Sequence, residues 1–172
     1  MALVPSDEND EAERCLASAL RILAYRFNSI VELRRKLAAK EFDPAVIEGI
    51  IERLTAERWL DDERFAGALV RTRALKRLGP QRIRRDLRAA GVDDDIAARA
   101  LRQNIDPEAE KSAAIALCEK KMRIIARRHG AAYLRTDEGR KKLAAYLLNH
   151  GYEAGRAFEV INLCVKRVAS SE

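Results

Sequence analysis

Apolar residues recur every three or four positions along most of this chain, the spacing of helices with one buried face. The first such run contains Cys15, Leu16, Ala19, Leu20, Leu23 and Phe27. The acidic residues before it suit the positive end of a helix dipole. No segment alternates between apolar and polar residues over a strand's length, and no Asn-Gly or Asp-Gly hairpin turn occurs. The pattern therefore predicts helices and no sheet.

Capping residues divide this pattern into short helices. Ser29 followed three residues later by Glu32 forms a capping box, in which both side chains accept hydrogen bonds from first-turn amides. A second helix is therefore expected over 30–40. Asp43 and Pro44 then supply an N-cap and a first-turn proline, so a third helix should follow.

The same kinds of capping and helix-breaking residue recur further along the chain. Asp61 and the two acids after it mark a helix start, Gly79-Pro80 separates this helix from the next, and Gly91 provides a left-handed stop. Asp106-Pro107 opens a last group, whose first helix is longer. Each group therefore resembles the first one, with three helices.

An internal triplication supports this division. The segments that align are 32–37, 82–87 and 142–147. Their anchors Leu33, Ile83 and Leu143 are separated by 50 and then 60 residues. Such a repeat indicates tandem helical units, each too small to close a core alone. We therefore expect an all-α fold, an elongated array of three tandem three-helix repeats. The expected divisions are a disordered acidic tail (1–9) and three repeats (10–59, 60–105 and 106–172).

Charge is distributed unevenly over these repeats. The first 13 residues contain five acids and no Lys or Arg, whereas residues 14–172 hold all 33 basic residues and 22 of the 27 acidic ones, a net +11. The basic residues concentrate in 71–88 and 120–142, with few acids between them. Most charge runs are solvated helix faces. A body this basic nevertheless suggests nucleic acid or an acidic protein surface as the partner.

No membrane or secretion signal is visible in the sequence. No apolar run approaches the roughly 20 residues of a membrane span, and the N-terminus is acidic where a secretory signal would be basic. The widely separated cysteines lie in helical apolar patterns, which favours reduced thiols in the core. They are Cys15, Cys118 and Cys164. We expect a cytoplasmic, soluble monomer with no membrane partner.

The chain offers no catalytic or metal-binding constellation. His129 and His150 are the only histidines, and neither has a second ligand at metal-binding spacing. Asp61 and Asp62 are interpreted as capping residues, because neighbouring positions on a helix point apart. Trp59 could stack on a base, but its apolar neighbours favour packing between repeats. We therefore expect no enzyme activity, no cofactor and no metal.

Several short motifs follow one another in a characteristic order. They are Arg26-Phe27-Asn28-Ser29-Ile30-Val31-Glu32-Leu33 with Lys36-Leu37, Leu60-Asp61-Asp62 with Phe65-Ala66, and Gly79-Pro80 with Ile83, Leu87 and Gly91-Val92. In this order and spacing they resemble the RecX family, bacterial modulators of the RecA recombinase. The resemblance is close over about 14–101 and looser in the last third. Glu41 departs from it, because the family often has Gly there to end the second helix.

The resemblance implies a binding function rather than catalysis. It implies that the chain occupies the helical groove of the RecA–DNA filament, mainly as an inhibitor of filament growth and of the recombinase, ATPase and coprotease activities. Single- or double-stranded DNA is a further candidate partner. The charge map, rather than the resemblance, selects the partner-binding candidates. They are Arg34, Arg35, Arg71, Arg73, Lys76, Arg77, Arg84, Arg85 and Arg88.

Two other functions fit parts of the pattern. An autonomous nucleic-acid-binding regulator, with a helix-turn-helix-like pair in each repeat, would account for the basic body. A HEAT-like scaffold shares the repeat logic, but it normally uses two-helix units and more repeats. The RecA modulator is preferred because it alone accounts for the order of the motifs.

Overall fold

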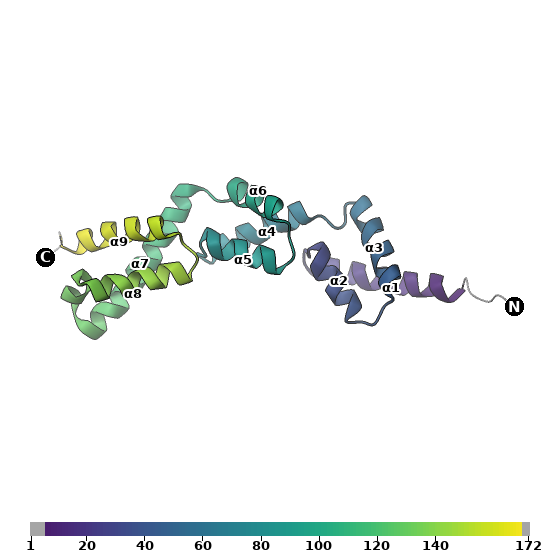
Figure 1. Ribbon diagram of the computed structural model, residues 1–172, viewed down its shortest axis with the longest axis horizontal. Coiled ribbons are helices and arrows are strands. Elements are labelled where there is room, and N and C mark those ends of the chain that lie inside the picture. Colours follow the sequence, from purple (N-terminus) through teal and green to yellow (C-terminus); the bar gives the residue numbers. More distant parts are fainter. Residues whose placement is uncertain (1–5, 170–172) are drawn as a thin grey trace. The chain divides into compact units, whose positions relative to one another are not determined.

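The computed structural model describes residues 6–169, which are helical apart from short connections (Figure 1). No strand occurs within this range, so the all-α prediction is confirmed. The helices are α1 (Ser6–Tyr25), α2 (Ile30–Ala38), α3 (Pro44–Ala56), α4 (Asp62–Leu75), α5 (Pro80–Ala89), α6 (Asp94–Asn104), α7 (Pro107–His129), the 3₁₀ helix η1 (Ala131–Arg135), α8 (Asp137–Asn149) and α9 (Ala154–Ala169).

Contacts divide the chain into two compact units. The first extends to Ala68 and includes residues 87–100, and the second holds residues 69–86 and everything from Leu101 onward. The division passes through α4, α5 and α6, so each unit contains one terminal group of helices and part of the middle group. The repeat boundaries expected from the sequence therefore stay a prediction.

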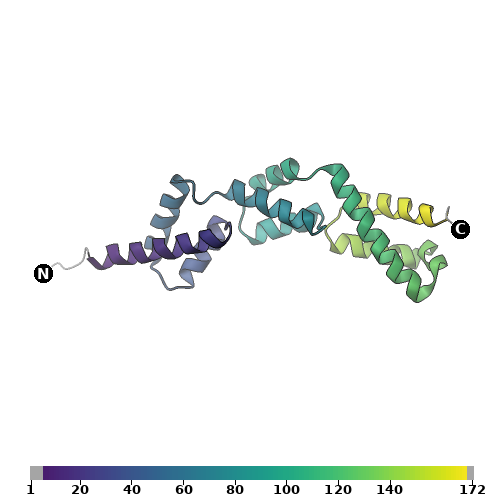
Figure 2. The ribbon, with the colours of Figure 1, turned by 180° about the vertical axis from the view of Figure 1, so that it is seen from behind.

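The core of the first unit is formed by α1, α2 and α3, which lie against one another (Figure 2). On α3, buried Ile47, Ile50, Ile51 and Leu54 form one stripe at the helical spacing. The complete cluster is Cys15, Ala19, Leu33, Leu37, Ile47, Ile50, Ile51, Leu54 and Leu60. The helical stripes of the sequence are thus the packing faces of the unit.

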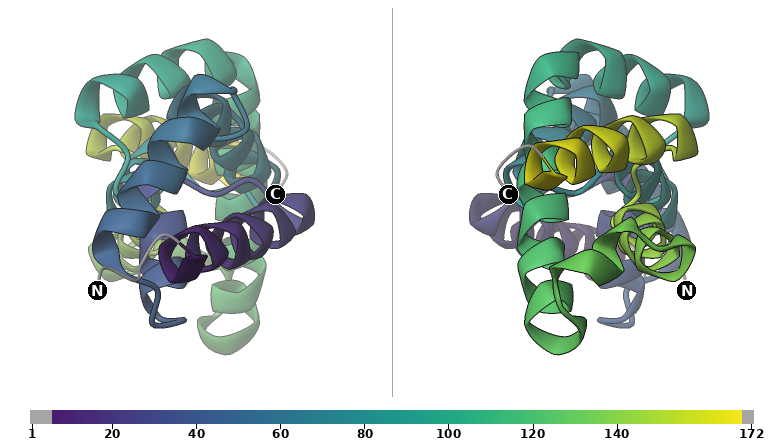
Figure 3. Two further views of the ribbon diagram at one scale, coloured as in Figure 1. Left: turned by 90° about the vertical axis from the view of Figure 1, so that its right-hand side faces the viewer. Right: turned by 90° about the vertical axis from the view of Figure 1, so that its left-hand side faces the viewer.

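The core of the second unit lies among α7, α8 and α9, and α9 crosses α7 in the right-hand view of Figure 3. Its fully buried centre includes Leu143, Leu147 and Val160. The repeat anchors Leu33, Ile83 and Leu143 are all 0% exposed, which explains why these positions recur. The three cysteines are buried and free, as expected. A hydrogen bond with Cys164, together with burial, raises the pKa of Cys118.

The expected disorder of the acidic tail is corrected in part. Residues 1–5 lie outside the described range, but α1 begins at Ser6, so residues 6–9 are helical rather than disordered. Asp10 and Glu11 follow in the second turn of this helix. Negative charge near a helix N-terminus complements the positive end of the helix dipole.

A left-handed residue follows the second helix of each group. Glu41, Gly91 and Gly151 have φ of 64°, 78° and 88°. A Cβ on Gly91 would lie 2.5 Å from the side chain of Val31, and one on Gly151 would lie 2.4 Å from the backbone of Arg82. Glu41 is exposed, so it has only the backbone strain of a non-glycine residue to overcome. Glu41 therefore supplies, after the second helix of the first group, the left-handed geometry that glycine supplies in the other two groups.

The same contact joins successive second helices. Ser29, which caps α2, donates its hydroxyl to the carbonyl of Ala90 at 2.5 Å, where α5 has just ended. At the equivalent place further along, the amide of Gly79 before α5 donates to the carbonyl of His150 at 2.8 Å, just after α8. The start of one second helix is thus held against the end of the next, once within each compact unit.

Candidate partner-binding surfaces

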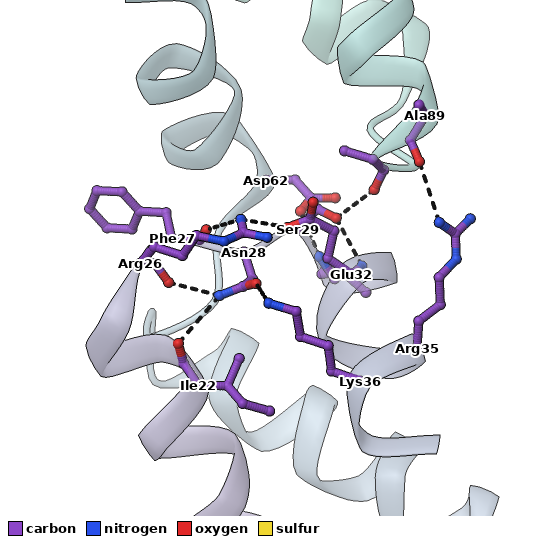
Figure 4. Close-up of polar contacts among 12 residues, drawn as sticks. Ile22, Arg26, Phe27, Asn28, Ser29, Glu32, Arg35, Lys36, Asp62 and Ala89 are labelled. Carbon is purple, nitrogen blue, oxygen red and sulfur yellow. Dashed lines mark hydrogen bonds and ion pairs between the residues drawn. The ribbon is translucent and has the colours of Figure 1, made fainter. Parts of the chain in front are cut away.

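The residues around the first motif form a polar network that fixes the connection between α1 and α2 (Figure 4). Asn28 and Ser29 are 2% and 0% exposed. The Asn28 amide donates to the carbonyl of Arg26 at 2.7 Å, and Lys36 donates to Asn28 Oδ1 at 2.6 Å. Arg26 also pairs with Glu32 at 2.9 Å. The side chains of this motif are therefore occupied in holding the fold.

The acids at the start of α4 have different roles. Asp61 accepts hydrogen bonds from the amides of Glu63 and Arg64 at 2.9 and 3.0 Å, as its capping role predicts. Asp62 instead accepts from the amide of Ile30 at 2.9 Å, across to α2. Burial raises the pKa of Asp62. The interpretation of Asp62 as a cap is therefore corrected, because its carboxylate satisfies the first amide of another helix.

The two candidate arginines on α2 differ in availability. Arg34 makes a bidentate ion pair with Glu48 of α3, with distances of 2.6 and 2.8 Å. This hydrogen bonding raises the pKa of Arg34 and lowers that of Glu48. Arg35 is exposed and reaches only the carbonyl of Ala89, at 3.4 Å. Most N–H donors of Arg35 are thus available to a binding partner, whereas Arg34 must first break its ion pair with Glu48.

The candidates on α5 show the same difference. Arg84 is exposed and has no side-chain partner among residues 6–169, and Arg85 donates weakly to the carbonyl of Gln81 at 3.4 Å. Arg88 pairs with Asp94 at 3.0 Å. Arg84 and Arg85 lie in the part of α5 that belongs to the second compact unit. They are the most available arginines of that helix.

The candidates on and after α4 divide in the same way. Arg71 donates to the Asn104 side chain at 2.7 Å, and Arg73 pairs with Asp86 at 2.7 Å. Lys76 and Arg77 are exposed, and neither side chain has a partner in the described part of the chain. Asp86, on α5, brings Arg73 of α4 next to that helix. The second compact unit therefore combines available cations from the end of α4 with those from the start of α5.

None of the partner-binding candidates lies in the basic segment 120–142, yet several cations of this segment lie beside aromatic rings. Lys121 Nζ is 5.1 Å from the centre of the Tyr146 ring, and Lys142 Nζ is 4.9 Å from that of Tyr133. His129 stacks on Tyr133 at 4.5 Å. The sequence carried a signal for this surface, because cations recur on single helix faces, but the pairing of α7 with α8 was required to bring them together.

No cluster of metal-binding side chains is found in the described residues. No group of three His, Cys, Asp or Glu side chains converges there. The Nδ1 atom of His150 lies 2.7 Å from the carbonyl of Tyr146 at the end of α8, which agrees with its interpretation as a residue that satisfies helix-terminal carbonyls. Within the same part of the chain, no helix is both long and apolar enough to cross a membrane.

The expectation for Trp59 was wrong. Its side chain is 59% exposed rather than packed between repeats. Leu60 takes the buried place instead, at 1% exposure, because Arg58 adopts a left-handed conformation just before the pair. Trp59 lines an open hollow of about 360 Å³ with Leu20 and Phe27, among others.

Two family models match the chain. The first three-helix domain of RecX matches residues 15–54, and the second matches residues 61–101. These matches cover the first two groups of helices, where the motifs lie.

Known proteins match over most of the chain. Regulatory protein RecX of Clostridium perfringens is 33% identical over 165 residues, which cover 96% of this chain and 73% of that protein. Regulatory protein RecX of Serratia proteamaculans is 34% identical over 159 residues, which cover 80% and 89%. The crystal structure of RecX from Lactobacillus salivarius matches with a TM-score of 0.77 at 25% identity, covering 91% of this chain and 97% of that one.

Proposed function

Because this chain belongs to the RecX family of regulatory proteins, we propose that it regulates the RecA recombinase by binding to the RecA–DNA filament. Its action is non-enzymatic and mainly inhibitory. It occupies the helical groove of the filament and limits filament extension, and with it recombination and the coprotease activity of the SOS response. The filament is the principal partner, and the DNA within it, single- or double-stranded, is a second one.

The observation that carries this proposal is the set of available cations on a repeated helical scaffold. The candidates with neither a carboxylate nor a side-chain amide as partner in the described residues are Arg35, Lys76, Arg77, Arg84 and Arg85. Exposed Arg side chains suit carboxylate and phosphate groups, because their planar guanidinium can donate two parallel hydrogen bonds. A filament coated with protein and DNA offers both kinds of acceptor.

The remaining candidates belong to the same proposal in a second role. Arg34, Arg73 and Arg88 pair with Glu48, Asp86 and Asp94. Exposed ion pairs of this kind contribute only about 0–1 kcal/mol. Arg34 and Arg88 can therefore exchange their carboxylate for a partner's at little net cost. Arg73 is less exposed, and Arg71 already donates to Asn104, so these two serve chiefly to orient the surface.

Binding through several helix groups supports a regulator that acts on a polymer. When one group binds a filament, the next is presented at high effective concentration, so modest contacts add up to tight binding. A repeated filament lattice offers equivalent sites to equivalent arginines, such as Arg35 and Arg85. The affinity of the chain would then rise with filament length, and a single RecA subunit would bind the chain more weakly than a filament does.

A second candidate function is an autonomous DNA-binding regulator, favoured by the +11 charge of residues 14–172. The two functions differ in whether RecA is needed. An autonomous reader of DNA would discriminate sequences at a fixed salt concentration without RecA, whereas phosphate contacts alone would weaken steeply with salt.

Co-sedimentation tests the proposal directly. RecA is assembled on single-stranded DNA with a slowly hydrolysed ATP analogue, pelleted with the purified chain, and compared with RecA alone and with DNA alone. The proposal expects the chain in the pellet only when filaments are present, at a moderate salt concentration that suppresses binding to bare DNA. Equal recovery with bare DNA would favour the autonomous regulator, and no recovery with filaments would overturn the proposal.

A further inference from the structure

A groove runs between α7 and α8 in the second compact unit, with a volume of about 390 Å³. In each helix, four of the lining residues stand at positions i, i+3, i+4 and i+7, and thus form one continuous face. They are Lys121, Ile124, Ile125 and Arg128 from α7, and Lys142, Ala145, Tyr146 and Asn149 from α8. His129 completes the lining. None of the predicted partner-binding residues lies here.

The charges of this groove are all positive. Lys121, Arg128 and Lys142 line it, and no Asp or Glu does. None of the three cations forms an ion pair with a carboxylate in residues 6–169. The nearby Glu138 accepts a hydrogen bond from the Tyr133 hydroxyl at 3.2 Å. The groove is therefore a concave site for an anion.

The cations lie toward the ends of the groove, and the middle is apolar. Lys121 reaches the Tyr146 ring at one end, and Lys142 lies near Tyr133 and His129 at the other. Lys121 and Arg128 are seven residues apart on α7, which separates their backbones by about 10 Å. Between them Ile124 is 40% exposed, an unusual place for a large aliphatic side chain on a charged surface.

This arrangement distinguishes between anionic ligands. A duplex presents phosphates along its outside but keeps its bases stacked, so it would leave the apolar middle empty. An acidic peptide would satisfy the cations, but it would cover Tyr146 and Ile124 only if an aromatic residue stood between its acids at the right spacing. An unpaired nucleotide has both parts, because its base stacks on aromatic and apolar side chains while the flanking phosphates meet Lys and Arg.

We propose that the groove between α7 and α8 binds an unpaired nucleotide of single-stranded nucleic acid. The base lies on Ile124 and on the Tyr146 ring, where it takes the place of Lys121 Nζ. The Lys121 side chain turns to the phosphate at one end, and Arg128 and Lys142 hold the phosphate at the other. This site does not depend on the proposed regulation of RecA, and it gives the last group of helices a ligand of its own.

Fluorescence anisotropy with a labelled oligothymidylate and the full chain, without RecA, tests the site. The double variant Lys121→Glu, Lys142→Glu is compared with Lys120→Glu, Lys141→Glu, which changes the adjacent, exposed residues and the net charge by the same amount. We expect the Lys121/Lys142 variant to bind about tenfold more weakly than the Lys120/Lys141 variant. Its affinity should also depend less on salt concentration than that of the Lys120/Lys141 variant. Equal losses would show attraction by net charge alone and would overturn the proposal.

The base contact is tested separately at Tyr146. Tyr146→Leu removes the aromatic ring and should weaken oligothymidylate binding at least about fivefold, whereas Tyr146→Phe keeps the ring and should retain it. A duplex of the same length should bind more weakly than the single strand and should not respond to Tyr146→Leu. No binding of the single strand, or identical binding by all three proteins, would refute the site, whatever the outcome with RecA filaments. Circular dichroism of each variant checks that the helices are intact.

Discussion

The amide of Gly79 donates a hydrogen bond to the carbonyl of His150 at 2.8 Å, which joins the start of α5 to the end of α8. A Cβ on Gly79 would lie 2.4 Å from the carbonyl carbon and oxygen of Gly151, closer than real contacts allow. A glycine is therefore required at position 79 so that two backbone segments can approach each other closely. It is not required for a left-handed conformation, since Gly79 does not adopt a positive φ. The equivalent contact between Ser29 and Ala90 uses a side chain for the same purpose.

Gly79→Ala should therefore destabilise the protein by about 1–3 kcal/mol, because the added methyl group meets backbone that cannot rotate away. Gly49→Ala is the matched control, since nothing lies within 4 Å of its Cβ position on α3. That change should stabilise the helix by about 0.5–1 kcal/mol. Thermal melts followed by circular dichroism should move in opposite directions, and a neutral Gly79→Ala would refute the tight junction.

Asp62 gives a prediction that depends on pH. Burial raises the pKa of its carboxyl in the folded state, so its contribution to stability is complete below the unfolded-state pKa and is lost as the pH rises through the folded-state pKa. Asp62→Asn removes the charge but keeps an oxygen to accept from the Ile30 amide. Its melting temperature should exceed that of the wild type at pH 7, and the difference should shrink on acidification.

The control for that substitution is Asp62→Ala, which leaves the Ile30 amide without its acceptor. It should destabilise the protein by about 1–3 kcal/mol at pH 7. If Asn and Ala behave alike in the same melts, the hydrogen bond between α2 and the start of α4 does not contribute to stability.

The contribution of Tyr152 to the free energy of unfolding should be lost at alkaline pH. Burial raises the pKa of its hydroxyl to about 12, and the hydroxyl donates to the carbonyl of Arg77 at 3.0 Å. An unfolded tyrosine ionises near pH 10, so the stability contributed by Tyr152 is lost between about pH 10 and 12. Tyr152→Phe should cost about 1 kcal/mol at pH 7. In urea titrations its stability should fall less steeply than that of the wild type over this alkaline range; parallel slopes would contradict the burial of the hydroxyl.

Arg84→Glu with Arg85→Glu tests the partner-binding surface on α5. Both side chains are exposed and neither has a carboxylate partner in the described chain, so helicity and melting temperature should hardly change. The concentration needed to inhibit RecA-dependent strand exchange should rise about tenfold or more, because two attractions become repulsions. Arg21→Glu with Arg102→Glu, also exposed and outside the candidate set, makes the same change in net charge. Inhibition that survives on α5, or falls equally in the control, would exclude this surface.

The helices and their buried faces could be predicted because the helical period and the caps are local properties of the sequence. Leu33, Ile83 and Leu143 were recognised as equivalent anchors, and all three are fully buried. The exposure of Trp59 could not be predicted, because it depends on the left-handed conformation of Arg58. No glycine marks that conformation in the sequence. Either Trp59 or its neighbour Leu60 could have filled the buried position.

The candidate surface was less predictable because the availability of a charge depends on which helices meet. Arg34 and Arg84 occupy equivalent places in the sequence, but only Arg34 faces a carboxylate, Glu48 on the next helix. Likewise, each half of the groove between α7 and α8 is a regular helix face in the sequence, but its positive ends and apolar middle exist only when Lys121 and Tyr146 come together.

RecA-dependent ATP hydrolysis on single-stranded DNA is the most direct measurement of the central claim. The purified chain is added before filament assembly, in amounts well below that of RecA, and steady-state hydrolysis is followed with time. A regulator that limits filament extension should reduce the rate by more than its molar ratio to RecA, because each bound molecule stops the addition of many subunits. A rate that stays unchanged even at equal amounts of the two proteins would show that the chain does not limit the extension of RecA filaments.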